Sequence, residues 1–247
     1  MDVYTITLLT LGALTAGFVN GFAGFGTALV ASGFWFLVLP PEIVPPLIVV
    51  AALAGQFVGL WKLAGRLSWS KSTYLISGGV FGVPVGTLLL TILDPNTVKM
   101  AIGGMLLCYS LVQFRGLSDL KLPVHRDGIA DRGIGFVSGI LGGIAGLSGV
   151  LPMIWLQVNK LSSAEQRARY QPFNLLILGF AAVAMGFVGK FNAALLPYAL
   201  IAVPFSLLGA FIGVRAYVGV SENTFRQIVL GLLFLSGCVI VAQTVMG

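Results

Sequence analysis

Charged residues are scarce in this chain. Only 9% of its 247 residues are Asp, Glu, Lys or Arg, against about 25% in soluble domains. This scarcity excludes an ordinary soluble domain. The net charge of +6 does not indicate nucleic-acid binding, because the basic residues stand singly in the links between apolar runs. With 57% hydrophobic residues, the chain is predicted to be an all-α integral membrane protein.

Cysteine and histidine are also rare, with two cysteines and one histidine. Cys108 and Cys238 lie inside apolar runs and predict neither a disulfide framework nor a metal site. The sequence contains no Walker A motif, no G-x-S-x-G turn and no H-E-x-x-H pair. We therefore expect no cofactor, no metal, no enzymatic activity and no ATP drive within this chain.

The apolar runs are long enough to cross a membrane, since about 20 residues span one. We predict eight full transmembrane helices and two glycine-broken segments, which are either re-entrant or made of short helices, for up to ten crossings. The expected helical stretches are 5–20, 27–39, 43–61, 73–93, 97–114, 133–142, 150–158, 170–189, 193–214 and 224–245.

Glycine breaks one apolar segment in each half of the chain. Residues 21–27 (GFAGFGT) interrupt the segment 5–39, and residues 143–149 (GIAGLSG) interrupt the segment 130–158. Paired breaks at matching places indicate a transporter binding site near the middle of the membrane. Non-helical backbone persists in a membrane only inside protein or beside a water-filled cavity, so the two breaks are expected to face each other.

The two halves correspond in sequence. Residues 23–26 (AGFG) match 145–148 (AGLS), and residues 96–99 (NTVK) match 223–226 (NTFR). Such ordered matches predict an internal duplication. We expect an N-terminal repeat at 1–115, a cytoplasmic linker at 116–132 and a C-terminal repeat at 133–247, together forming one transmembrane unit.

Lys and Arg gather on one side when the spans are threaded. The other side holds only Lys99 and Lys190. By the positive-inside rule the richer side is cytoplasmic, so both termini are predicted to be extracytoplasmic and the two repeats inverted, in a plasma (inner) membrane. The cytoplasmic side holds Lys62, Arg66, Lys71, Arg115, Lys121, Arg126, Arg132, Lys160, Arg167, Arg169, Arg215 and Arg226.

The breaks are suited to an anion. Helices that restart near Thr27 and Gly149 would direct their positive N-terminal ends at the breaks, which favours an anion by roughly 0.3–2 kcal/mol per helix end. The alternative is that the glycines only permit close helix packing. The predicted substrate-binding residues are Asn20, Gly21, Gly24, Phe25, Gly26, Thr27, Gly143, Gly146, Leu147, Ser148 and Gly149.

Polar residues near the span starts are predicted to form the entrance and path. Arg167 and Arg169 begin a span whose counterpart in the first half is apolar, which favours an anion-attracting entrance. Plain topology charges and helix–helix hydrogen bonds are the alternatives. The full entrance and path set is Gln56, Arg167, Arg169, Gln171 and Asn174. Expected interfacial anchors are Trp35, Trp61, Tyr74, Trp155 and Tyr170.

The glycine-rich stretches 17–26 (GFVNGFAGFG) and 139–152 (GILGGIAGLSGVLP) resemble those of the TauE/SafE sulfite exporter family, also called toluenesulfonate uptake permeases. The resemblance implies transport of sulfur-containing anions such as sulfite, sulfoacetate and other organosulfonates. The family often has a triple glycine followed by proline in both halves. Here Val30 stands where the second half has Pro152, so the resemblance makes Thr27 and Ser148 candidate selectivity residues.

Together these observations predict a secondary transporter that exports or imports small anions by alternating access around a mid-membrane site. Its expected partners are a small anionic substrate and the lipid bilayer, with no nucleic acid. An anion channel, a permease for other small organic anions and a membrane scaffold or maturation partner are the alternatives. The sequence leaves the oligomeric state open, a homodimer included.

Overall fold

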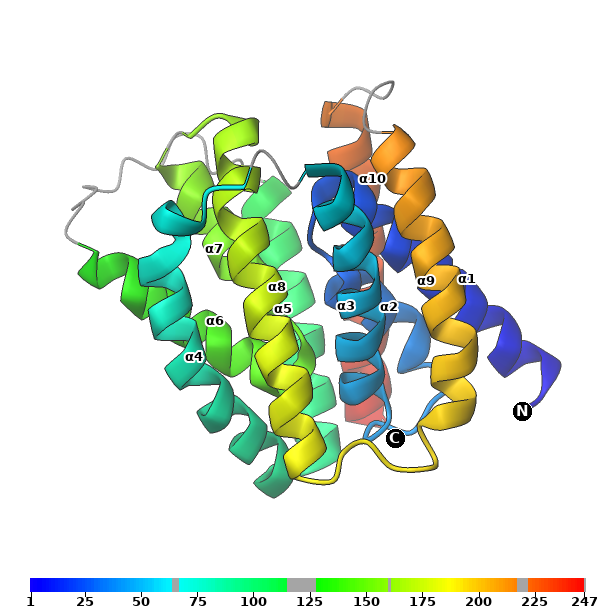
Figure 1. Cartoon of the computed structure of the whole chain (residues 1–247). Helices are drawn as coiled ribbons and strands as arrows, with labels where there is room; N and C mark the ends of the chain where they lie inside the picture. The colour runs from blue at the N-terminus through cyan, green and yellow to red at the C-terminus, as the bar shows by residue number, and fades with distance from the viewer. Residues whose placement is uncertain (64–66, 115–127, 160, 217–221, 247) are drawn as a thin grey trace.

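The computed structural model describes residues 1–63, 67–114, 128–159, 161–216 and 222–246, and in these ranges all regular secondary structure is helical (Figure 1). The helices are α1 (Val3–Ala23), α2 (Thr27–Trp35), α3 (Val44–Leu63), α4 (Trp69–Ile92), α5 (Pro95–Phe114), α6 (Ile129–Ala145), α7 (Val150–Val158), α8 (Ser163–Phe187), α9 (Leu196–Ala216) and α10 (Glu222–Met246).

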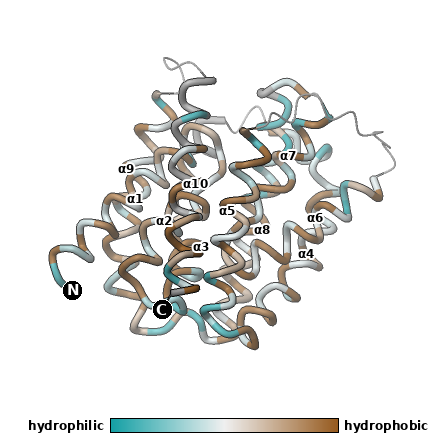
Figure 2. The backbone as a smooth tube through the Cα atoms, turned by 180° about the vertical axis from the view of Figure 1, so that it is seen from behind, coloured by the Kyte–Doolittle hydropathy of each residue, from teal (hydrophilic) through white to brown (hydrophobic). Residues whose placement is uncertain are grey.

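Five stretches in the described ranges are long and apolar enough to cross a membrane: α1, α4, α5, α9 and Glu165–Phe187 of α8. Large apolar side chains on their outer faces are exposed, among them Phe81 and Phe187, at 73% and 88%. Figure 2 shows hydrophobic residues along most of the helix lengths. Exposed apolar faces of this size suit lipid rather than water. The chain is a multi-pass membrane protein, whereas the predicted number of crossings stays a prediction.

Glycines bring two pairs of helices into direct backbone contact. Helix α4 packs along α6, and α1 packs along α9. A Cβ added to Gly82 would lie 2.0 Å from the carbonyl oxygen of Phe136, and one added to Gly213 would lie 2.1 Å from that of Phe18. Only small residues permit such close approach of two helices. Each pair joins a helix of the predicted first repeat to one of the second.

Both broken segments end their first helix in the same way. Gly24 and Gly146 adopt left-handed conformations, with φ of 83° and 70°, and their N–H groups donate to Asn20 O at 2.6 Å and Gly142 O at 2.9 Å. Glycine adopts this conformation without steric cost, which ends the helix. Helices α2 and α7 then restart, each with nine residues, about half of what a full crossing needs.

The two chain ends lie at the same end of the bundle, at the bottom of Figure 1, and the C-terminal ends of α3, α5 and α9 lie at the opposite end. Helix α6 begins at Ile129, inside the segment predicted as the linker 116–132. Residues 116–127 of that segment lie outside the described ranges. The repeat boundaries therefore stay a prediction.

Two aromatic residues are placed differently from the sequence prediction. Trp35 and Tyr170 are buried, at 0% and 2% exposed, so the prediction that they are interfacial anchors is wrong. Trp35 ends the half-length helix α2, and its Nε1 donates to Leu9 O at 3.2 Å. Tyr170 faces the first break from α8. The side chain of Trp61 lies outside the described part of the chain.

Candidate functional site

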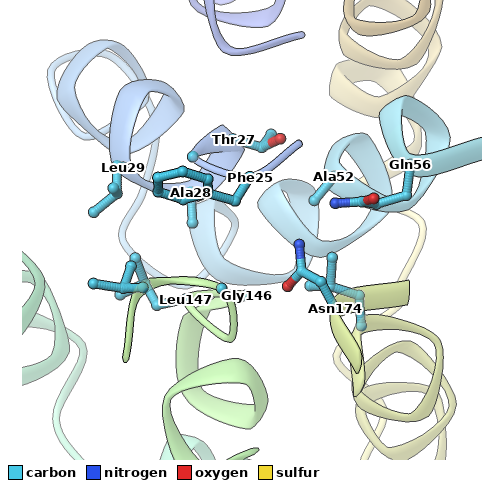
Figure 3. A pocket seen from close by; sticks show the side chains of 13 residues that line it. Phe25, Thr27, Ala28, Leu29, Ala52, Gln56, Gly146, Leu147 and Asn174 are labelled. Carbon is cyan, nitrogen blue, oxygen red and sulfur yellow. The ribbon is translucent and has the colours of Figure 1, made fainter. Parts of the chain in front are cut away.

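The two breaks lie against each other and line one pocket (Figure 3). A Cβ added to Gly149 in the second break would lie 3.0 Å from Phe25 Cβ in the first. The prediction that the breaks face each other is confirmed. The pocket contains about 260 Å³ of empty space, part of it open to solvent. It is lined by Phe25, Gly26, Thr27, Ala28, Leu29, Ala52, Gln56, Gly146, Leu147, Gly149, Val150, Asn174 and Leu178.

Two helices begin at this pocket. Gly26 precedes α2 and Gly149 precedes α7, and neither position has a side chain that caps the helix. Both glycines line the pocket, together with the first residues of each helix, Thr27 and Val150. The first N–H groups of a helix have no partner within it and carry a partial positive charge. Two such ends at one pocket form an arrangement suited to an anion.

Thr27 adds a hydroxyl to the α2 side of the pocket. The residue is only 3% exposed, and its buried Oγ1 has no hydrogen-bond partner among the described residues. A buried polar group without a partner is unfavourable unless a ligand or water satisfies it. Thr27 is therefore a donor available to an occupant of the pocket.

Asn174 of α8 lies on the opposite side of the pocket (Figure 3). The hydroxyl of Ser148 donates to its Oδ1 at 2.5 Å. Since this bond engages the amide oxygen, the amide nitrogen is the group left for an occupant, and Figure 3 shows that nitrogen on the side facing Ala52. Ser148 is itself fully buried and acts on the pocket through Asn174.

Side chains of α3 and α8 hold the C-terminal end of α1. Gln56 Nε2 donates to Gly24 O at 2.9 Å, and the hydroxyl of Tyr170 donates to the carbonyl of Ala23. The guanidinium of Arg167 donates to the carbonyls of residues 22 and 21 at 3.2 and 2.9 Å. The last carbonyls of a helix lack intrahelical partners. Four consecutive carbonyls, 21–24, are thus satisfied by side chains distant in sequence, which we call the α1 clamp.

Asn20 and Gln56 form a buried amide pair next to this clamp. Gln56 Nε2 also donates to Asn20 Oδ1 at 3.1 Å, and Asn20 Nδ2 donates to Ala52 O at 3.3 Å. Both side chains are 3% exposed. The pair ties α1 to α3 beside the pocket, where Gln56 and Ala52 form part of the wall.

The structure brings most of the predicted binding residues to the pocket, but not all of them. Gly21 and Gly143 lie on helix-packing faces. A Cβ added to Gly21 would lie 2.1 Å from Ala210 O, and one added to Gly143 would lie 2.5 Å from Val83 O. For these two glycines, the structure agrees with the alternative that they permit close helix packing. Asn20, Gly24 and Ser148 lie directly behind the wall, and the lining set is Phe25, Gly26, Thr27, Gly146, Leu147 and Gly149.

The predicted entrance and path residues also separate. Gln56 and Asn174 line the pocket, and Arg167 belongs to the α1 clamp. Arg169 lies on the same helix, and its buried Nε has no partner among the described residues. Gln171 is buried at 3% exposed, with no partner for its Oε1 among the described residues. Their roles as an entrance and path stay a prediction.

Sequence reasoning missed the apolar wall and the tyrosine of the clamp. Ala52, Val150 and Leu178 line the pocket, but in sequence they are ordinary members of apolar runs. Tyr170 meets Phe25 edge to face, with ring centroids 5.9 Å apart. Its position in sequence, next to the polar start of a span, resembled that of an anchor. In the described part of the chain, no three His, Cys, Asp or Glu side chains lie together as a metal site would require.

Comparison with known proteins places the chain in a family. The family model for the sulfite exporter TauE/SafE matches residues 9–240, which include both breaks, the α1 clamp and every residue of the pocket. Neither the curated proteins nor the solved structures contain a match. Because the family match extends over nearly the whole length, the chain belongs to the TauE/SafE sulfite exporter family.

Proposed function

We propose that this protein is a secondary transporter of small sulfur-containing anions, such as sulfite or organosulfonates, and that they bind in the pocket between the two breaks. The family is described by sulfite export, which supports the substrate class. The observation that carries the assignment to this pocket is the pair of uncapped N-termini, α2 and α7, beside the unpartnered hydroxyl of Thr27. These donors would replace the water that an anion loses on entering.

The proposed mechanism is alternating access. Residues 1–115 and 133–247 would form two inverted repeats, and the glycine-packed pairs α1/α9 and α4/α6 would each move as one body. The half-helices α2 and α7 would stay at the centre, as the broken helices of secondary transporters do. The protein would lie in the plasma membrane, and the positive-inside rule supports an orientation with both termini on the extracytoplasmic side.

A matched pair of threonine variants tests the site. Thr27 and Thr87 are both buried, at 3% and 2% exposed, and in the described structure neither Oγ1 has a partner. Only Thr27 lines the pocket. We expect sulfite or an organosulfonate to raise the melting temperature of the purified protein, because a ligand of the folded state stabilises it by mass action. Thr27→Val should weaken this binding about tenfold through loss of one donor to a charged group, and Thr87→Val should not.

Equal stabilisation of both variants would exclude the Thr27 hydroxyl from the site. A melting temperature unaffected by any sulfur anion would contradict the proposed function itself. If, in addition, the protein keeps its function in cells after the glycines of the two breaks are substituted, a membrane scaffold is favoured instead.

A further inference from the structure

The pocket wall carries no formal charge among the described residues. Its polar groups are the amides of Gln56 and Asn174, the hydroxyl of Thr27 and backbone N–H groups. All other side chains that line it are apolar, and the glycines have none. An anion that enters must therefore be balanced by helix ends or by charges outside the wall, since an uncompensated buried charge is strongly unfavourable.

The C-terminal helix ends at the breaks oppose the N-terminal ones. Helices α2 and α7 begin there, and α1 and α6 end there. An N-terminus is equivalent to roughly +0.5 charge and a C-terminus to roughly −0.5, so the two breaks together sum to about zero. The N-terminal ends still face the pocket, but their effect is reduced by the nearby C-terminal ends.

Arg167 changes this balance. In the described structure it is the only charged side chain that donates to the break backbone, through its bonds to Gly21 O and Phe22 O. Its positive charge lies against the negative end of α1, and a unit charge is about twice the partial charge of a helix end. Arg169, two residues along α8, has no such contact among the described residues, and its buried Nε has no hydrogen-bond partner there. Within the described ranges no acidic side chain lines the pocket.

We propose that the pocket takes singly charged anions in preference to doubly charged or zwitterionic ones, and that Arg167 supplies the one balancing charge from outside the wall. This inference rests on the proposed function and narrows it. Arg167 then acts as a positioning and charge-balancing residue for the site and does not touch the substrate. For sulfite, the bound species would be the singly protonated form, hydrogensulfite.

A series of two-carbon sulfonates tests the charge preference. Taurine, ethanesulfonate and sulfoacetate share the sulfonate group and differ in net charge, which is zero, minus one and minus two near neutral pH. Binding to the wild-type protein in detergent is measured by thermal stabilisation over a range of concentrations. We expect ethanesulfonate to bind at least about tenfold more tightly than either of the others, because only its charge is balanced. Sulfoacetate or taurine binding as tightly as ethanesulfonate would overturn the inference and leave the proposed function standing. Binding of none of the three, nor of sulfite, would contradict both.

Variants of Arg167 test the source of the charge. Arg167→Gln should lose about tenfold in ethanesulfonate affinity and should lower the ratio of ethanesulfonate to taurine affinity towards one. Arg167→Lys should keep the ratio close to that of the wild-type protein, because it keeps the charge while losing the paired donors. Arg132→Gln is the control, because it removes a positive charge that lies over the Tyr74 ring, and it should leave the ratio unchanged.

The affinity ratio separates charge balance from a structural role. If Arg167→Gln lowers the melting temperature but keeps the wild-type ratio, Arg167 is a structural residue only and the inference is wrong. If Arg167→Gln cannot be purified, the inference is tested by the ratio of ethanesulfonate to taurine affinity in Arg167→Lys and in the wild-type protein. If the ratio in Arg167→Lys falls to one, the charge at this position does not set the preference, and the inference is wrong.

Discussion

The two breaks end their helices by the same device and are held by different means. In each, a left-handed glycine, Gly24 or Gly146, turns the chain before a nine-residue helix restarts. The first break is held by polar bonds from α3 and α8 to carbonyls 21–24. The second is held by apolar contact, since a Cβ on Gly146 would lie 3.0 Å from Ile48 Cγ2, and, within the described ranges, by a side-chain hydrogen bond from Ser148 to Asn174.

This difference shows how a duplicated pattern can give an asymmetric site. The local sequence rule, glycine at the helix end, is the same in both halves because it concerns backbone conformation. The surrounding residues are free to differ, so α8 supplies an arginine and a tyrosine to the first break. The second break instead supplies Ser148, which orients Asn174. One break carries the charge balance, and the other sets the direction of an amide donor.

The largest expected effect comes from the turn glycines. Gly24→Ala should lower the free energy of unfolding by about 2–3 kcal/mol, from left-handed strain and loss of a clamp bond. A Cβ there would lie 2.6 Å from the Tyr170 hydroxyl. Gly146→Ala should cost less, because the atom it meets is the end of an apolar side chain. Gly189→Ala, with φ of 71° and nothing within 4 Å, should cost only the strain.

The order of the three stability losses is measured by unfolding each alanine variant in mild detergent and monitoring the unfolding by circular dichroism. If Gly24→Ala is no less stable than Gly189→Ala, the clamp at the first break does not constrain the chain.

A smaller effect is expected from single hydroxyls on the two sides. Tyr170→Phe removes the bond to Ala23 O and keeps the ring against Phe25, so it should cost about 0.6–1.7 kcal/mol of stability. Ser148→Ala should cost a similar or smaller amount of stability. It should, however, change ligand affinity more, because it frees the amide of Asn174 to rotate.

Thermal unfolding and ethanesulfonate titration of both variants measure the two effects separately. If ethanesulfonate affinity is unchanged in Ser148→Ala and falls strongly in Tyr170→Phe, the roles assigned to the two breaks are reversed.

Much of the helical arrangement was predictable from the sequence, since apolar runs and glycines act locally. The expected stretches 97–114 and 150–158 correspond closely to α5 and α7. The meeting of the two breaks followed from the rule that irregular backbone in a membrane must be enclosed. The roles of Gly21 and Gly143 could not be assigned, because a glycine that packs helices and one that faces a ligand look the same in sequence.

The α1 clamp was not predictable, because it joins residues about 145 positions apart, such as Arg167 and Phe22. The sequence did carry a trace of it. Arg167 begins a span whose counterpart in the first half is apolar, which predicts an entrance. Tyr170 lies near the same span end, which predicts an interfacial anchor. Whether these side chains are exposed at the membrane interface or buried against the first break depends on the tertiary structure. The periodicity of the sequence does not show this.

The most direct test of the central claim, that sulfur anions cross the membrane through the pocket between the breaks, is counterflow in proteoliposomes. Vesicles loaded with unlabelled ethanesulfonate are diluted into a trace of labelled ethanesulfonate. We expect transient accumulation of label with the wild-type protein and with Thr87→Val, and much slower accumulation with Thr27→Val. Equal rates for all three would place the path elsewhere. No accumulation in any of them, in the presence of anion conductance, would indicate a channel and contradict the account.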